Sequence, residues 1–172
     1  TYRFAYTNFD QKGVLPNSEI DKNVLSFSAG YDVTDKLTVT SSINYVYTEG
    51  LGRYGTGYDS RNPNQSFRQW YNVGTDFTDQ KRAYDETGLN LSWNPYGPGD
   101  PARATTPHYF DNYYFNRHEN FSTDNRSRMF GNVSLDYEVT DWLNLTGRVT
   151  TDRYNELQEE RIAVGAVDVP KY

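Results

Sequence analysis

The chain of 172 residues contains 16 tyrosines, one methionine and no cysteine, with a formal net charge of −6 and a mean hydropathy of −0.89. The length predicts one ordinary domain, the lack of cysteine excludes disulfides, cysteine–zinc sites and thiol catalysis, and the acidic balance argues against nucleic acid as a partner. No window approaches eighteen consecutive apolar residues, which excludes transmembrane helices but not membrane strands, whose residues alternate.

Five segments alternate apolar and polar residues with a period of two, which is typical of strands with two different faces. In chain order they span residues 1–9, 23–31, 37–48, 126–137 and 143–154. The sequence YDVTDKLTVT at 31–40 returns as YEVTDWLNLT at 137–146, so one hairpin occurs twice. The pattern predicts an all-β, antiparallel fold. Because the chain begins inside a strand, we expect it to be a fragment of a longer protein.

Residues 50–55, GLGRYG, match the order of a dinucleotide-binding loop at Gly50, Gly52 and Gly55. That loop needs a strand buried on both faces before it and a helix start after it. Here the preceding strand alternates, and the sequence that follows, TGYDSRNPNQS, has the composition of a loop. We therefore expect a flexible loop and no cofactor.

The segment 49–125 separates the third and fourth strands and is rich in aromatic residues. Within it NQSFRQWYN and TDQKRAYDE (78–86) are candidate short helices. So long an insertion in a compact domain is usually functional. Its candidates for stacking on sugar rings or for packing on a partner are Trp70, Tyr71, Tyr109, Phe110, Tyr113 and Tyr114. The alternative is that these rings pack against one another and hold the loop shut.

The connections between the strands alternate in length. Long segments at 10–22, 49–125 and 155–172 lie at one end of the strands, and the short turns 32–36 and 138–142 lie at the other. Short periplasmic turns opposite long extracellular loops are typical of an outer-membrane β-barrel. The strands of a soluble sandwich alternate apolar and polar residues equally well, so that alternative remains. The one-sided loop lengths favour the barrel.

The two predicted faces of the strands differ in charge. The apolar faces of 23–31, 37–47, 129–137 and 143–149 carry none, which suits lipid, and aromatic residues beside the short turns suit an interfacial girdle. The opposite face suits a wet lumen. The charged residues predicted to face the lumen are Arg3, Arg128, Asp136, Arg148 and Asp152.

Other reactive side chains indicate little chemistry. His108 and His118 lack the spacing of a metal-binding motif, so we expect exposed loop histidines and no metal site. Glu156, Glu159 and Glu160 follow the last predicted strand and are expected to form a solvated charge cluster rather than a glycosidase pair. We therefore expect no catalytic residue and no enzyme activity.

Several ordered motifs resemble one family. KGVLPNSEIDKN, the two Y-x-V-T-D-x-L turns, GRYGTGYDSRNPNQSFRQWY, RMFGNVSLDYEVTDWLNLTGRV and ELQEERIAVG are similar to the barrel of SusC-like (SusC/RagA) TonB-dependent transporters of Bacteroidota. The resemblance covers nearly the whole chain and implies a 22-stranded outer-membrane barrel with an N-terminal plug, energised through TonB. It also implies import of glycans or peptides with a SusD-like surface lipoprotein.

The resulting hypothesis is a transmembrane barrel segment of about five strands with one long extracellular loop. The plug and the TonB box of the family are absent from these residues, and five strands cannot close a barrel. The alternative is a soluble secreted β-domain that binds carbohydrate through its aromatic loop. A hydrolase built on Glu156 with Glu159 or Glu160 is the least favoured reading.

Overall fold

The computed structural model describes residues 1–53, 55–57 and 62–167. These residues form two compact units, where the sequence predicted one domain. The sheet unit comprises Thr1–Lys12, Ile20–Gly50 and Asp124–Gln158, and the loop unit comprises Gly13–Glu19, Leu51–Thr123 and Glu159–Tyr172.

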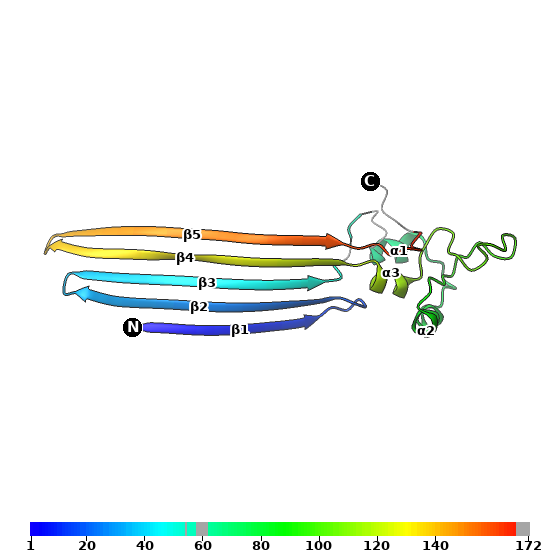
Figure 1. The fold of residues 1–172 in the computed structure, drawn as a ribbon, viewed down its shortest axis with the longest axis horizontal. Helices are drawn as coiled ribbons and strands as arrows, with labels where there is room; N and C mark the ends of the chain where they lie inside the picture. The colour runs from blue at the N-terminus through cyan, green and yellow to red at the C-terminus, as the bar shows by residue number, and fades with distance from the viewer. Residues whose placement is uncertain (54, 58–61, 168–172) are drawn as a thin grey trace. The chain divides into compact units, whose positions relative to one another are not determined.

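The sheet unit is built on one five-stranded antiparallel sheet in the order β1-β2-β3-β4-β5, which is not closed into a barrel (Figure 1). Each strand pairs with its neighbour in sequence, and β3 pairs with β4 across the long insertion. The strands are β1 (Tyr2–Lys12), β2 (Glu19–Thr34), β3 (Leu37–Leu51), β4 (Ser122–Thr140) and β5 (Leu143–Glu160).

The prediction of five antiparallel strands is confirmed, but the strands are longer than the apolar alternation suggested. β1 and β2 extend into the predicted loop 10–22, and β5 runs through Glu156 and Glu159 to Glu160. The placement of these glutamates in a loop was therefore wrong. Backbone pairing needs only neighbouring N–H and C=O groups, so a strand continues where its side chains have turned polar. For the same reason Gly50 lies in β3 rather than in a loop.

Cross-strand side-chain contacts fix the register of the sheet. The Ser26 hydroxyl donates to Asn44 at 2.7 Å, and the Thr38 hydroxyl donates to Asp32 at 2.7 Å, so β2 and β3 pair without a slip between these two points. At Gly131 in β4, an added Cβ would lie 2.2 Å from the Ser42 carbonyl oxygen of β3. The approach of the two backbones therefore requires glycine at this position.

The loop unit contains three short helices: α1 (Pro63–Gln69), α2 (Phe77–Thr87) and α3 (Tyr113–Glu119). The first two confirm the predicted short helices, whereas α3 was not predicted, because its aromatic residues resembled an aromatic loop. In the described ranges, no helix is long and apolar enough to cross a lipid bilayer.

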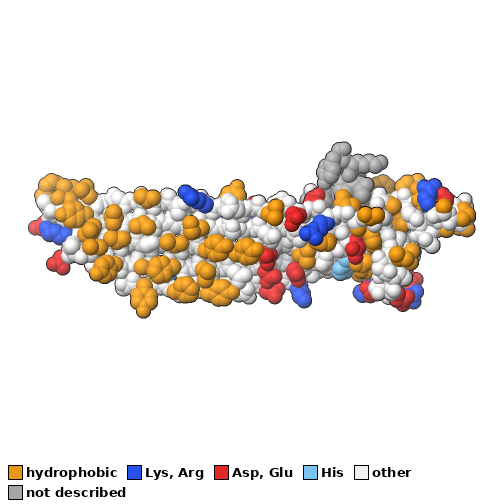
Figure 2. Space-filling model, in the orientation of Figure 1, with side chains coloured by type: hydrophobic (Ala, Val, Ile, Leu, Met, Phe, Trp, Pro, Cys, Tyr) orange, Lys and Arg blue, Asp and Glu red, His pale blue; other side chains and the backbone are white. Residues whose placement is uncertain are grey.

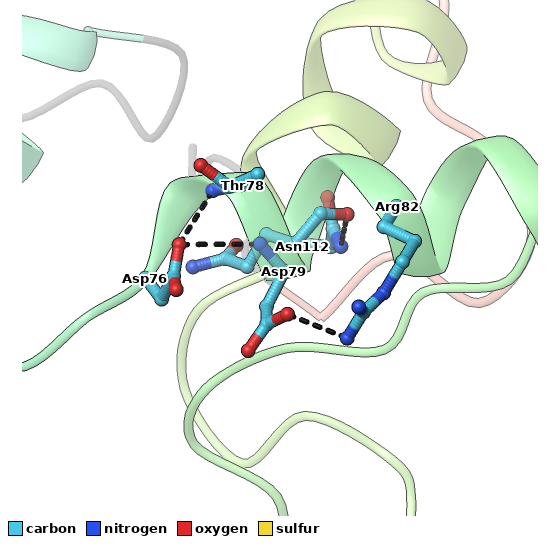
Figure 3. A network of polar contacts seen from close by, with 6 residues as sticks. Asp76, Thr78, Asp79, Arg82 and Asn112 are labelled. Atoms are coloured by element: carbon cyan, nitrogen blue, oxygen red, sulfur yellow. Dashed lines mark hydrogen bonds and ion pairs between the residues drawn. The ribbon is translucent and has the colours of Figure 1, made fainter.

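Helix ends in the loop unit are set by capping side chains. The Asp76 carboxylate accepts hydrogen bonds from the backbone N–H groups of Thr78 and Asp79 at the start of α2 (Figure 3), and Gly88 ends the helix with a φ of 66°. Asn112 caps α3 in the same way as Asp76 caps α2. Oxygen acceptors at this position pair backbone donors that have no partner within a helix.

The buried core lies in the loop unit and is mainly polar. Of the described hydrophobic residues only Tyr113 and Phe115 in α3 and Pro107 are buried. Their buried neighbours in the loop unit are Ser66, Gln80, Asp111, Asn112, Asn116, Arg117, Asn120 and Ser122. A core of this kind is stable only when its polar groups are hydrogen-bonded.

Candidate functional site

The aromatic residues of the long insertion form one connected cluster. The Phe67 ring lies 5.3 Å from Tyr71, 5.1 Å from Phe77 and 5.5 Å from Tyr113, measured between ring centroids. Tyr71 also meets the Trp93 ring edge-on at 5.9 Å. Edge and tilted contacts of this kind stabilise a cluster beyond the area that the rings bury. The cluster brings α1, α2 and α3 together.

The six aromatic residues predicted to contact a ligand or partner divide into two groups. Tyr113 is buried, and Tyr71, Phe110 and Tyr114 are half-buried and pack on other rings. Trp70 and Tyr109 expose 47 % and 63 % of their surface, although each also stacks on a neighbouring ring. Four of the six residues thus pack among the rings themselves, which was the alternative raised by the sequence. Trp70 and Tyr109 remain accessible to a ligand.

The two histidines lie in separate stacks. His108 lies between Tyr96 at 4.2 Å and Tyr109 at 3.8 Å, and the Arg103 guanidinium covers the Tyr96 ring at 4.0 Å. His118 is half-buried in α3, rather than exposed in a loop as predicted, and stacks on another ring. In the described ranges, no group of three or more His, Cys, Asp and Glu side chains could hold a metal ion.

The ring that stacks on His118 belongs to Tyr84 in α2. Its hydroxyl donates a 2.7 Å hydrogen bond to the Glu119 carboxylate in α3. Burial, together with this hydrogen bond to Glu119, raises the pKa of the Tyr84 phenol to about 12. The bond therefore requires the protonated phenol and ties α2 to α3.

Asn112 is the centre of the polar core and is fully buried. Its Nδ2 donates to the carbonyls of Gln80 and Leu91, both at 2.8 Å, while its Oδ1 accepts from Tyr114 and Phe115 at the start of α3. One side chain therefore joins three segments that are distant in sequence. The sequence offered one signal for this role, an Asp-Asn pair before an aromatic run, which is a helix-start pattern.

Arg117 is the second buried node of the loop unit, and its partners are backbone carbonyls. Its Nε donates to Pro16 at 3.1 Å and its guanidinium donates to Gly52 at 2.6 Å, while Asn17 donates to the Arg117 carbonyl at 3.0 Å. Burial lowers the pKa of Arg117. These contacts hold the β1–β2 connection against the β3–β4 insertion. No sequence motif pointed to Arg117.

Gly52 shows why the glycine-rich stretch has its composition. Its φ is 69°, and an added Cβ would lie 1.8 Å from the Asn17 carbonyl oxygen. The glycine allows a left-handed turn and the close approach of the β1–β2 connection. Gly50 lies in β3 and no helix follows the motif in the described residues 55–57, so this stretch lacks the helix start of a dinucleotide site. Tyr54 falls outside the described residues.

A hollow of about 360 Å³ lies beside the first turns of α2. Trp93 and Gln80 line it together with Asp76 and Asp79. Figure 3 shows the last two at the start of α2. The remaining lining residues are Gly74, Thr75, Ala83, Leu91 and Ser92. Sequence reasoning missed this hollow, because its residues come from three segments with no shared motif.

The polar face of the sheet carries the residues predicted to face a lumen. Arg128 in β4 donates two hydrogen bonds to Asp152 in β5, at 2.8 Å and 2.5 Å. The Asp136 carboxylate accepts from the Thr146 hydroxyl at 2.6 Å. Arg3 and Arg148 are exposed on β1 and β5. The structure therefore brings together Arg128 with Asp152 but not the five residues as one site.

The other face of the sheet carries a band of exposed apolar side chains. In the register of the sheet Tyr6, Leu25, Tyr45 and Met129 form one row across β1 to β4, and Arg153 continues this row on β5. From this row towards the short turns, the residues on this face carry no charge along β2 (Leu25 to Val33) or along β4 (Met129 to Val139). Exposure is 66 % at Phe4 and 75 % at Val149.

The band ends at the same level on neighbouring strands. The next row towards the long loops is Asn8, Asn23, Tyr47 and Ser127, and the row after that is Asp10, Asp21, Glu49 and Asn125. Figure 2 shows this face, with apolar side chains over the strands and acidic side chains gathered beyond them. The nine residues from Leu25 to Val33 span about 30 Å at roughly 3.3 Å per residue.

Comparison of the chain with family models, with curated proteins and with solved structures found no match.

Proposed function

We propose that this chain is part of the wall of an outer-membrane transporter of the SusC-like, TonB-dependent class, with the loop unit as an extracellular loop. The observation that carries the proposal is the level apolar band on one face of the sheet, which carries no charge on β1 to β4. Its length of nine residues along β2, from Leu25 to Val33, matches the roughly 9–11 residues with which a tilted strand crosses a bilayer. Its side chains are exposed rather than packed in a core.

The distribution of charge supports the same assignment. A charge facing lipid at mid-depth costs about 2–4 kcal/mol. The band carries none on β1 to β4, and on β5 Arg153 lies in its last row, opposite Met129. The other face carries Arg128, Arg148 and Asp152. A soluble sheet would cover such a face, because large exposed apolar patches are rare on soluble proteins. The strands continue beyond the band on the side of the long connections, as expected of strands that project from a membrane.

In this proposal the residues contribute to transport without chemistry. The polar face lines the wet interior of a larger barrel, whose remaining strands cover the open edges at β1 and β5. The loop unit meets a SusD-like surface lipoprotein and the glycan or peptide that it captures. Coupling to TonB belongs to parts of the transporter outside these residues.

Cysteine accessibility tests the proposal, since these 172 residues contain no cysteine. Two matched pairs of neighbours, Leu135→Cys with Asp136→Cys and Ile43→Cys with Asn44→Cys, are introduced into the intact native polypeptide in cells. We expect a water-soluble maleimide to label the Asp136 and Asn44 positions, and only a lipid-soluble maleimide to label the Leu135 and Ile43 positions. The parent protein gives the background, and Asn64→Cys on exposed α1 gives full labelling.

Equal labelling of both members of each pair would contradict the membrane assignment. So would recovery of the intact polypeptide in the soluble fraction without detergent. Either result would favour the alternative of a secreted β-domain that binds carbohydrate through the loop unit.

A further inference from the structure

A hollow of about 640 Å³ lies on the face of the sheet that carries the apolar band. Tyr45 in β3, Met129 in β4 and Arg153 in β5 line it and belong to the last row of the band. Ser127 and Asn155 also line it and belong to the next row towards the long connections. The hollow therefore lies where the apolar band ends and the polar rows begin.

Two further lining residues, Asp152 and Tyr154, use their side chains on the opposite face of β5, because successive side chains of a strand point to opposite faces. The Asp152 carboxylate accepts two hydrogen bonds from Arg128, and the Arg126 guanidinium covers the Tyr154 ring at 4.6 Å. Among the described lining residues, none therefore points a carboxylate into the hollow.

The side chains on the band side of the hollow offer accessible hydrogen-bond donors. Arg153 and Asn155 are exposed, and Tyr45 exposes 41 % of its surface, so a ligand can reach them. In the described part of the chain, no residue forms an ion pair or a side-chain hydrogen bond with Arg153, Asn155 or Ser127. A guanidinium, an amide and a hydroxyl are thus available to one ligand.

Arg153 is the one charged residue of the band within the described ranges. On the same face of β1 to β3 the first carboxylates, at Asp10, Asp21 and Glu49, lie two rows farther towards the long connections. A charge costs far less near the end of a membrane strand than at mid-depth. Arg153 is therefore tolerated at the boundary of the band, and its charge has no counter-ion among the described residues.

These groups select an anion that also has an apolar part. A guanidinium binds a phosphate through two parallel N–H···O bonds, and the Ser127 hydroxyl and the Asn155 amide can donate to further oxygens. Tyr45 and Met129 offer apolar surface on the side of the band, which a free inorganic ion leaves unused. We propose that the hollow binds the phosphate of an anionic lipid headgroup, with the attached acyl chains lying along the band.

This inference rests on the proposed function, because a lipid reaches the hollow only where the band faces a bilayer. It adds a specific anionic site to a face that is otherwise apolar. The labelling experiment probes Leu135 and Ile43 within the band, whereas lipid binding probes Arg153 at its end. The two proposals therefore fail separately.

Native mass spectrometry of the intact polypeptide in a non-ionic detergent measures the site. The probes are phosphatidylglycerol, which carries an anionic phosphate, and diacylglycerol, which has the same chains without it. Inorganic phosphate is added as a competitor that lacks the chains. We expect phosphatidylglycerol to bind about tenfold more tightly than diacylglycerol and to resist an equal concentration of inorganic phosphate. Equal binding of diacylglycerol would overturn the role of the phosphate, and displacement by inorganic phosphate would overturn the lipid.

Charge variants locate the phosphate. Arg153→Gln removes the charge, and we expect it to weaken phosphatidylglycerol binding about tenfold. Arg153→Lys keeps the charge but not the paired donors and should weaken binding about threefold. Arg148→Gln makes the same change as Arg153→Gln on the opposite face of β5, where Arg148 is exposed, and should bind within about twofold of the parent. Unchanged binding in Arg153→Gln, or an equal loss in Arg148→Gln, would overturn the site.

A variant that keeps every charge tests the hollow itself. Ser127→Trp places an indole in it, and we expect about tenfold weaker binding because the phosphate can no longer approach Arg153. Leu145→Trp puts the same ring elsewhere on the band face of β5 and should bind within about twofold of the parent. β-Sheet circular dichroism checks that both variants keep the sheet. Parent-like binding by Ser127→Trp would put the lipid outside the hollow and overturn the inference.

The labelling and binding results together separate the two proposals. Alternating labels with unchanged lipid binding in Arg153→Gln would leave the transporter assignment standing and remove this site. Equal labels with Arg153-dependent binding of phosphatidylglycerol would remove the transporter assignment and leave an anionic-lipid site on the sheet.

Discussion

The sheet unit and the loop unit place their apolar and polar side chains in opposite ways. In the sheet, apolar residues such as Phe27 and Leu135 are left exposed in a band that carries no charge on β1 to β4, and among the described residues of this unit Ser134 is the only buried polar one. In the loop unit, side-chain amides and a guanidinium fill the interior and aromatic rings surround them. One unit lacks a protein core, and the other has a core that is mainly polar.

The difference indicates where each unit finds its stability. Backbone ladders hold the sheet, and the exposed band needs an apolar medium to become favourable. The loop unit instead depends on a few side chains that each make several hydrogen bonds, so it should be sensitive to single polar substitutions. The predictions below test this contrast.

The largest effect is expected at Asn112. Asn112→Ala leaves two carbonyls and two N–H groups without their partners in a buried site, and should destabilise the loop unit by about 3–5 kcal/mol. Hydrogen exchange of peptides from α3 in the intact protein should rise, while exchange of β4 peptides stays unchanged. Asn64→Ala on the exposed face of α1 is the control. Equal loss of protection in both units would mean that they do not unfold separately.

In the sheet, the largest effect of a small substitution is expected at Gly131. An added methyl group meets the Ser42 carbonyl oxygen, so Gly131→Ala should separate β3 from β4 at a cost of about 2–3 kcal/mol. Gly147→Ala, on the same face in β5, meets no atom within 4 Å and should be neutral. Urea unfolding followed by β-sheet circular dichroism measures both. Similar midpoints for the two variants would show that the strands do not need glycine at residue 131.

A pH effect confined to the loop unit is expected from Tyr84. Its pKa is raised from 10.0 to about 12 by burial and by the bond to Glu119. A raised pKa in the folded protein means that the contribution to stability is complete below pH 10 and is lost as the pH rises through about 12. Exchange of α2 peptides should therefore increase over that range in the parent more than in Tyr84→Phe. Identical profiles would show that Tyr84 ionises as freely as an exposed tyrosine.

The smallest effect is expected from the ion pair on the polar face of the sheet. Arg128 and Asp152 expose 41 % and 52 % of their side chains, so water screens their attraction. Asp152→Asn should lower the stability of the sheet only slightly. Urea unfolding at low and high salt measures the change, with Asp136→Asn as the matched variant. A loss comparable with that of Gly131→Ala would mean that the pair is far less hydrated than its exposure indicates.

The sequence alone predicted the five strands, their two faces and the helices α1 and α2. It succeeded because alternation with a period of two and apolar spacing at i, i+3 and i+4 are local properties of the chain. It also separated charged residues such as Arg148 and Asp152 from the apolar face. The repeat YxVTDxL placed the two short turns correctly, since each turn is formed by neighbouring residues.

Only the tertiary structure decided how far the strands run, that Asn112 starts a third helix, and that Arg117 joins two connections. It also assembled the hollow from Asp76, Gln80 and Trp93, which share no sequence motif. The physical reason is the same in each case. A polar residue is stable in a strand, in a core or in solvent according to the hydrogen-bond partner it meets, and that partner is supplied by chain distant in sequence.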